Sequence, residues 1–188
     1  GIYARGTVTV NDAIVTATGG SGNASYGLYI DSSSPSVTIS GGGSLTARSE
    51  SADRAGGIYV LNFFGSAGAV TVGDNSTLLA NSVILYDNSF TENPLAPTGN
   101  GSWLIYGQSN QPSAVGGTYT LKENITIPSG AVVTIPAGST LTIPNDKTLT
   151  VDNANQLVVN GELVLEGTFD NAKELEGSGN LVLGEITL

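Results

Sequence analysis

Apolar residues alternate with threonine in a row of short segments between residues 124 and 159. Each segment is an apolar-Thr-apolar triplet, or an apolar-Val-apolar triplet in the last case, and a corner rich in Pro, Gly, Asn or Asp separates it from the next. Alternation with a period of two is typical of a strand that buries one face. The first residues of the triplets are eight positions apart: Ile125, Val133, Leu141, Leu149 and Leu157. The pattern therefore predicts short strands repeated every eight residues.

A longer repeat occupies residues 1–86. The tetrapeptides GIYA, GLYI and GIYV begin at residues 1, 27 and 57, so their spacings are 26 and 30 residues. A Val-Thr-apolar or similar strand and then a third short apolar segment follow each of them, which predicts three strands and three corners per repeat. Three eight-residue units have a similar length, so one winding scheme fits both halves of the chain.

A strand of three or four residues cannot bury an apolar face alone, so neighbouring repeats must cover it. We therefore expect one elongated all-β domain over residues 1–188: a single-stranded parallel β-helix, wound as a three-sided solenoid, with the right-handed coil favoured. Residues 1–86 would form long coils of about 26–30 residues, and residues 118–188 short regular coils. Residues 87–117, rich in Pro, Gly, Asn and Ser, read as a long loop excursion, with Leu104 to Tyr106 as a candidate strand within it.

The repeat becomes shorter toward the C-terminus. Apolar residues recur there at intervals of six positions instead of eight, namely Leu163, Phe169, Leu175 and Leu181. We expect the coil to taper over this segment.

Charge and composition exclude several classes of partner. The chain has 16 acidic and 6 basic residues and a net charge of -10, which argues against nucleic acid, because a basic patch supplies most of that affinity. No apolar run approaches the roughly 20 residues of a membrane helix, so we expect no membrane insertion of this segment. The chain lacks Cys and His, which removes thiol chemistry, the commonest general base and the usual metal ligands. We expect no cofactor and no metal site.

The repeat units resemble a known class of module. The Pro-Gly-rich units, such as VTIPAGSTLTIP at residues 133–144, and the coils that begin with GIY or GLY look like the β-helix modules of large bacterial surface-exposed or secreted adhesin-like proteins. This resemblance implies an extracellular or cell-surface location and a structural or carbohydrate-associated role. It implies no catalytic residue. The chain lacks Met even at position 1, and we expect further domains of the same protein to adjoin it.

Aromatic residues form the candidate binding site. Strict alternation places Tyr3, Tyr29 and Tyr59 on the outward side of equivalent strands. Since stacked strands lie about 4.8 Å apart, the rings would form a column on which the sugars of a polysaccharide or a host or cell-surface glycan could lie. Trp103 and Tyr106 extend this candidate carbohydrate site. The alternative is that the tyrosines pack on one another, or under long loops, and stabilise the wall.

The sequence favours a non-catalytic scaffold or adhesin segment over an enzyme. The alternative is a β-helix polysaccharide lyase or glycoside hydrolase, which needs a base beside carboxylates or two carboxylates at a fixed separation. The nearest candidates lie in one corner, Arg48, Glu50, Asp53 and Arg54, where surface salt bridges are the simpler explanation. Thr-x-Thr pairs suggest ice binding, but pairs eight residues apart fall on successive faces of a three-sided coil, so ice binding is not expected.

Overall fold

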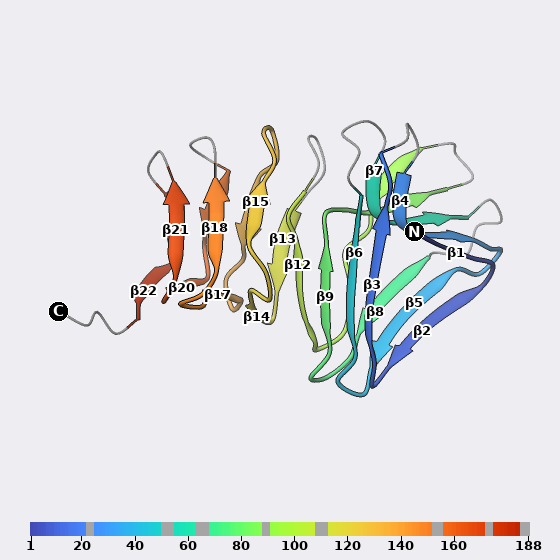
Figure 1. Ribbon diagram of the computed structural model, residues 1–188, viewed down its shortest axis with the longest axis horizontal. Coiled ribbons are helices and arrows are strands. Elements are labelled where there is room, and N and C mark those ends of the chain that lie inside the picture. The colour runs from blue at the N-terminus through green and yellow to red at the C-terminus, as the bar shows by residue number, and fades with distance from the viewer. Residues whose placement is uncertain are drawn as a thin grey trace. The chain divides into compact units, whose positions relative to one another are not determined.

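The protein is built from β-strands. The computed structural model describes residues 1–21, 25–49, 55–62, 68–87, 91–107, 113–151, 156–171 and 175–184. These residues contain no helix, and their strands pair mainly in parallel (Figure 1). The expectation of an all-β fold with parallel sheets is confirmed. The described part of the chain has no helix of the length and hydrophobicity that crossing a bilayer requires.

The chain divides into two compact units, unit 1 (Gly1–Trp103) and unit 2 (Leu104–Leu188), and the boundary falls within β12 (Ser102–Ile105). Three groups of paired strands make up unit 1. The first group comprises β1 (Ile2–Ala4), β4 (Ser25–Asp31), β7 (Ala55–Leu61), β10 (Val83–Tyr86) and β11 (Glu92–Pro94). The second comprises β2 (Thr7–Asn11), β5 (Ser36–Ser40) and β8 (Ala69–Val72). The third comprises β3 (Ile14–Gly19), β6 (Ser44–Ser49) and β9 (Thr77–Ala80).

In unit 1, each of these strands from β1 to β7 pairs in parallel with the third strand after it along the chain. Tyr3 is the register partner of Tyr29, and Tyr29 is the register partner of Tyr59. The spacings of 26 and 30 residues in the sequence are therefore confirmed as one full repeat of three strands each. The pair β10 and β11 is antiparallel.

Unit 2 contains three further groups that follow the same rule, except that β20 pairs with β22, the second strand after it. The first comprises β13 (Ser113–Gly116), β16 (Val133–Ile135) and β19 (Leu157–Val159). The second comprises β14 (Thr118–Thr120), β17 (Thr140–Ile143), β20 (Glu162–Leu165) and β22 (Asn180–Leu183). The third comprises β15 (Ile125–Ile127), β18 (Thr148–Val151) and β21 (Thr168–Asn171).

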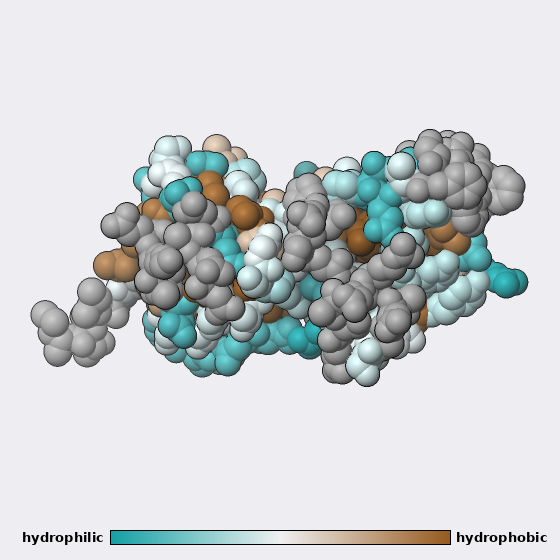
Figure 2. All heavy atoms as spheres, turned by 90° about the horizontal axis from the view of Figure 1, so that it is seen from above, coloured by the Kyte–Doolittle hydropathy of each residue, from teal (hydrophilic) through white to brown (hydrophobic). Residues whose placement is uncertain are grey.

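The eight-residue pattern places its apolar residues in the core. The first residue of every triplet is at most 3% exposed: Ile125, Val133, Leu141, Leu149 and Leu157. The middle residues are partly or fully exposed, as the alternation predicts. Burying an aliphatic side chain of this size contributes about 1.5–3 kcal/mol, so the inward face of each short strand supplies most of its stability. The outer surface seen in Figure 2 is mostly hydrophilic or intermediate, with smaller apolar patches.

The predicted shortening of the repeat is visible in the strand register. Val133 and Leu157 are register partners 24 positions apart (133 to 157). In the next repeat Val158 and Glu176 are partners only 18 positions apart (158 to 176). Toward this end the strand faces become exposed, and Leu181 in β22 is 50% exposed.

Residues 87–117 differ from the expected loop excursion. They contain β11, β12 and β13, while residues 88–90 and 108–112 lie outside the described part. β12 includes Leu104 and Ile105, so the expected strand there begins two residues earlier than predicted and ends one residue earlier. The local excess of Pro, Gly and Asn hides these strands, because their apolar runs are too short to stand out in the sequence.

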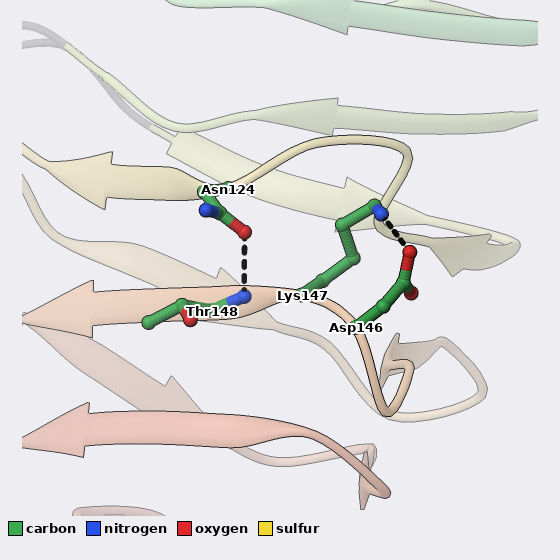
Figure 3. A network of polar contacts seen from close by, with 4 residues as sticks. All are labelled: Asn124, Asp146, Lys147 and Thr148. Atoms are coloured by element: carbon green, nitrogen blue, oxygen red, sulfur yellow. Dashed lines mark hydrogen bonds and ion pairs between the residues drawn. The ribbon is translucent and has the colours of Figure 1, made fainter.

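Polar side chains connect successive repeats in unit 2. The Oδ1 atom of Asn124, just before β15, accepts a hydrogen bond of 2.9 Å from the backbone N–H of Thr148, the first residue of β18 (Figure 3). Beside it, Lys147 forms an ion pair with Asp146. The hydrogen bond that Lys147 donates in this pair lowers the pKa of the Asp146 carboxyl. The corner before β18 is therefore held both to the preceding repeat and within itself.

Candidate functional site

Four tyrosines on successive strands of unit 1 form a continuous stack, here called the tyrosine column: Tyr3, Tyr29, Tyr59 and Tyr86. The ring centroids of Tyr3 and Tyr29 are 5.5 Å apart, as are those of Tyr29 and Tyr59. The corresponding planes lie 13° and 5° from parallel. Tyr86 continues the stack, with its centroid 6.2 Å from that of Tyr59. Register pairing thus brings three of the predicted residues together.

Exposure differs along the column and is lowest at Tyr59, while Tyr86 beyond it is again partly exposed. Tyr3 is 56% exposed, Tyr29 is partly exposed and Tyr59 is only 7% exposed. Each inner ring has its faces against its neighbours, as stacked parallel rings must. Sugars stack on the face of an aromatic ring, so the inner rings present edges and not binding platforms. This geometry favours lateral packing of the tyrosines over a glycan laid along the whole column.

Tyr26 is a fifth member of the cluster that the alternation does not reveal. Its ring centroid is 4.4 Å from that of Tyr59 and 5.4 Å from that of Tyr29, in tilted contacts. The register partner of Tyr26 is Gly56, and a Cβ there would lie 3.3 Å from Cδ1 of Tyr26. The absence of a side chain at Gly56 leaves room for this ring. The signal in the sequence is the pair of glycines at residues 56 and 57, directly before Ile58 and Tyr59.

Charged residues bind the hydroxyl groups of the column. The Tyr3 hydroxyl donates to Oδ2 of Asp31 at 3.2 Å, and Nε of Arg5 donates to the Tyr3 hydroxyl oxygen at 3.2 Å. The Arg5 guanidinium carbon also lies 6.0 Å from the Tyr3 ring centroid, at the limit of a cation–π contact. The Tyr59 hydroxyl donates to Oε1 of Glu92, on β11, at 3.4 Å.

Burial keeps the inner hydroxyls protonated. It is the main cause that raises the pKa of Tyr59 above its ordinary value, and Tyr26 and Glu92 raise it further. Burial also raises the pKa of Tyr29, with a second contribution from the nearby charge of Asp31. Both groups are neutral near pH 7, as an ordinary tyrosine is, and the raised pKa keeps them neutral to more alkaline pH, so the Tyr59 hydroxyl remains a hydrogen-bond donor there.

The sequence predicts that Trp103 and Tyr106 extend the aromatic site, but neither ring belongs to the tyrosine column. Trp103 belongs to unit 1, is partly exposed, and has no ring contact with the tyrosine column among the described residues. Tyr106 belongs to unit 2, is also partly exposed, and contributes to the raised pKa of the buried Tyr119. The five predicted site residues therefore include one cluster of three and two residues outside it.

The charged corner and the threonine pairs, which the sequence offered as weaker candidates, form no functional site among the described residues. Of the charged corner, only Arg48 is described, while Glu50, Asp53 and Arg54 lie outside the described residues. Within the described ranges, no three Asp, Glu, His or Cys side chains gather in a way that could hold a metal ion. Thr140 on β17 and Thr148 on β18 belong to different sheets, as the argument against ice binding expects.

Comparisons of the chain with protein-family models, with curated protein sequences and with solved structures found no match.

Proposed function

We propose that the chain is a three-sided parallel β-helix, wound as a solenoid with the right-handed coil favoured, and that it serves as a non-catalytic scaffold or adhesin segment outside the cell. The pairing of strands with the third strand further along supports the winding, because three strands then complete one turn. The resemblance of its repeats to bacterial surface modules supports the location. Further domains of the same protein would supply its attachment.

The tyrosine column is the observation that carries the scaffold role. Rings stacked in register on successive strands add aromatic contacts to the backbone hydrogen bonds between repeats. Each contact joins one repeat to the next, so the column resists separation of the repeats along the axis in which they stack. A spacer or stalk that bears load needs this property.

Stretching single molecules tests the scaffold role directly. The chain is held between two handles, and its unfolding force is compared with that of the variant Tyr29→Leu, which removes one of the two inner rings of the column. A scaffold stiffened by the column is expected to unfold at a clearly lower force in the variant. Equal forces would contradict the role given to the column. Release of reducing ends from a panel of polysaccharides by the fragment would contradict the non-catalytic assignment and favour the lyase or hydrolase.

A second candidate function, contact with carbohydrate, is favoured at the exposed end of the column. Tyr3 has the most exposed ring, and Arg5 and Asp31 place a donor group and an acceptor group beside its hydroxyl. An aromatic ring flanked by charged hydrogen-bonding groups suits a sugar ring and its hydroxyls. A glycan array tests this: binding by the fragment should be lost in Tyr3→Ala and kept in Thr9→Ala. Equal loss or no loss in both variants would contradict a site at Tyr3.

A further inference from the structure

A polar groove lies in unit 2 where the repeat changes length. It has a volume of about 310 Å³. Its walls come from the corners of three successive repeats, and six of the lining residues have polar side chains: Ser139, Thr140, Asn160, Glu162, Ser178 and Asn180.

The change in corner length explains the hollow. Between β16 and β17 the chain makes a full turn, in which the Ser139 N–H donates to the Pro136 carbonyl at 3.0 Å and Gly138 has a φ of +82°. The corresponding corner between β19 and β20 consists of Asn160 and Gly161 alone. The N–H groups of both residues donate to one carbonyl, that of Ile135, at 2.8 Å. The short corner at Asn160 and Gly161 therefore lies close against the end of β16. The longer turn between β16 and β17 extends beyond this short corner.

The bottom of the groove is glycine backbone. A Cβ at Gly161 would lie 2.3 Å from the carbonyl oxygens of Pro136 and Ser139. A Cβ at Gly179 would lie 2.2 Å from the Gly161 oxygen. No other residue fits at either position, so the two glycines allow the three corners to stack this closely.

Three polar side chains line one wall in a regular row. Thr140, Glu162 and Asn180 are register partners on β17, β20 and β22. Adjacent strands lie about 4.8 Å apart, so a hydroxyl, a carboxylate and an amide follow one another at that interval. The row offers both donors and acceptors.

Several polar groups of the groove retain unused hydrogen-bonding capacity. Among the described residues, the carboxylate of Glu162 forms no ion pair or hydrogen bond, and neither does the hydroxyl of Ser139, although that residue is only 8% exposed. Oδ1 of Asn160 accepts from the N–H of Ser178 at 3.4 Å and from its hydroxyl at 3.5 Å, which leaves the Asn160 amide NH₂ as a donor. Polar groups in a hollow favour a ligand that brings its own hydrogen-bonding groups.

We propose that this groove binds a neutral hexose unit of a saccharide. The lining has no aromatic or large apolar side chain, which disfavours an apolar ligand. The single carboxylate disfavours an anion and supplies too few oxygens for calcium, which needs six to eight. A sugar ring offers closely spaced hydroxyls that both donate and accept, and the volume suits one such ring. The groove lies in unit 2 and the tyrosine column in unit 1, so the failure of one proposal does not entail the failure of the other.

Titration by ¹H–¹⁵N NMR spectroscopy tests the proposal with the intact 188-residue chain. The probes are the methyl glycosides of glucose, galactose, mannose and N-acetylglucosamine, each raised to about 20 mM because a single sugar ring is expected to bind in the millimolar range. At least one probe is expected to give saturable shifts of the Gly161, Gly179 and Asn180 amide signals. The absence of saturable shifts with all four probes, or shifts confined to other residues such as Tyr3, would overturn the proposal.

Matched variants separate a groove site from a general surface effect. The double variant Glu162→Ala/Asn180→Ala is expected to weaken binding by about tenfold or more, because it removes two hydrogen-bonding groups of the row. The control is Thr142→Ala, which alters the next outward position of β17 outside the groove. Circular dichroism and retained amide signals of β17 establish that the double variant is folded. Unchanged affinity in the double variant, or equal weakening in the control, would overturn the proposal.

Discussion

Tyr29 and Tyr59 stack with their ring centroids 5.5 Å apart and their planes 5° from parallel, because they are register partners on β4 and β7. Tyr29 also contacts Tyr3 and Tyr26, so its ring has three aromatic neighbours. We expect Tyr29→Ala to lower the free energy of unfolding by about 3 kcal/mol, since it removes a large ring and several aromatic contacts. Urea unfolding followed by circular dichroism measures the change.

The control for this prediction is Tyr29→Phe, which keeps the ring. Among the described residues the Tyr29 hydroxyl forms no hydrogen bond, so its loss should cost less than about 1 kcal/mol. If Phe and Ala destabilise the protein equally, ring stacking is not the source of the stability.

Glycine at position 27 is required by the close approach of two neighbouring strands. A Cβ at Gly27 would lie 2.5 Å from the Ala17 carbonyl oxygen and 2.5 Å from the Arg48 backbone nitrogen, on two different neighbouring strands. Backbone atoms cannot move aside as a flexible side chain can. We therefore expect Gly27→Ala to destabilise the protein by roughly 3 kcal/mol or more, measured as a lower urea midpoint.

Gly20, in the preceding repeat, provides the matched comparison. A Cβ there would have no atom within 4 Å. Gly20→Ala is expected to change the free energy of unfolding by no more than about 0.5 kcal/mol. Similar losses in the two variants would mean that the close approach at Gly27 does not limit stability.

The buried tyrosine hydroxyls make stability sensitive to alkaline pH. Burial, together with Tyr26 and Glu92, raises the pKa of Tyr59 in the folded protein above its unfolded value near 10. The unfolded chain therefore loses this proton first, so the contribution of Tyr59 is fully present below about pH 10 and decreases as the pH rises above it. We expect the melting temperature to fall above about pH 10.

The variant Tyr59→Phe isolates this contribution. It has no proton to lose at this position, so its melting temperature should fall less steeply between about pH 10 and 11.5 than that of the parent. Tyr119, whose pKa burial also raises, leaves a remaining slope in the variant. Identical slopes in the two proteins would show that Tyr59 ionises in the folded state as easily as in the unfolded state.

The strands and their register follow from local patterns and could be predicted. Alternation alone places Ile125 and Leu149 inward, and the repeated Ile-Tyr and Leu-Tyr pairs align Tyr3 with Tyr29 and Tyr59. These features depend on neighbouring residues within one strand and on recurring short sequence units, both of which the sequence displays directly.

Features that depend on corners and on distant segments could not be predicted in this way. Tyr26 lies three residues before Tyr29, so alternation assigns it to the opposite side of the strand, yet its ring joins the cluster, where Gly56 leaves room for it. The partner of the Tyr59 hydroxyl, Glu92, comes from an antiparallel strand in a segment that reads as loop. The groove near Glu162 arises from a difference in length between two corners, which has no signature in either corner alone.

The hydrogen bond between Asn124 and Thr148 connects two repeats through one side chain. Oδ1 of Asn124 accepts from the Thr148 N–H at 2.9 Å, at the start of β18 (Figure 3). Removing the acceptor leaves that N–H to water or to no partner, so we expect Asn124→Ala to lower the free energy of unfolding by about 1 kcal/mol. Asn124→Asp keeps an acceptor oxygen at the same place and should retain most of the stability.

Amide hydrogen exchange gives the site-specific readout for this hydrogen bond. The Thr148 N–H should exchange faster in the Ala variant, and in the Asp variant it should exchange nearly as slowly as in the parent. Unchanged exchange at Thr148 in the Ala variant would mean that the backbone of β18 is held at this point by its strand neighbours and not by Asn124.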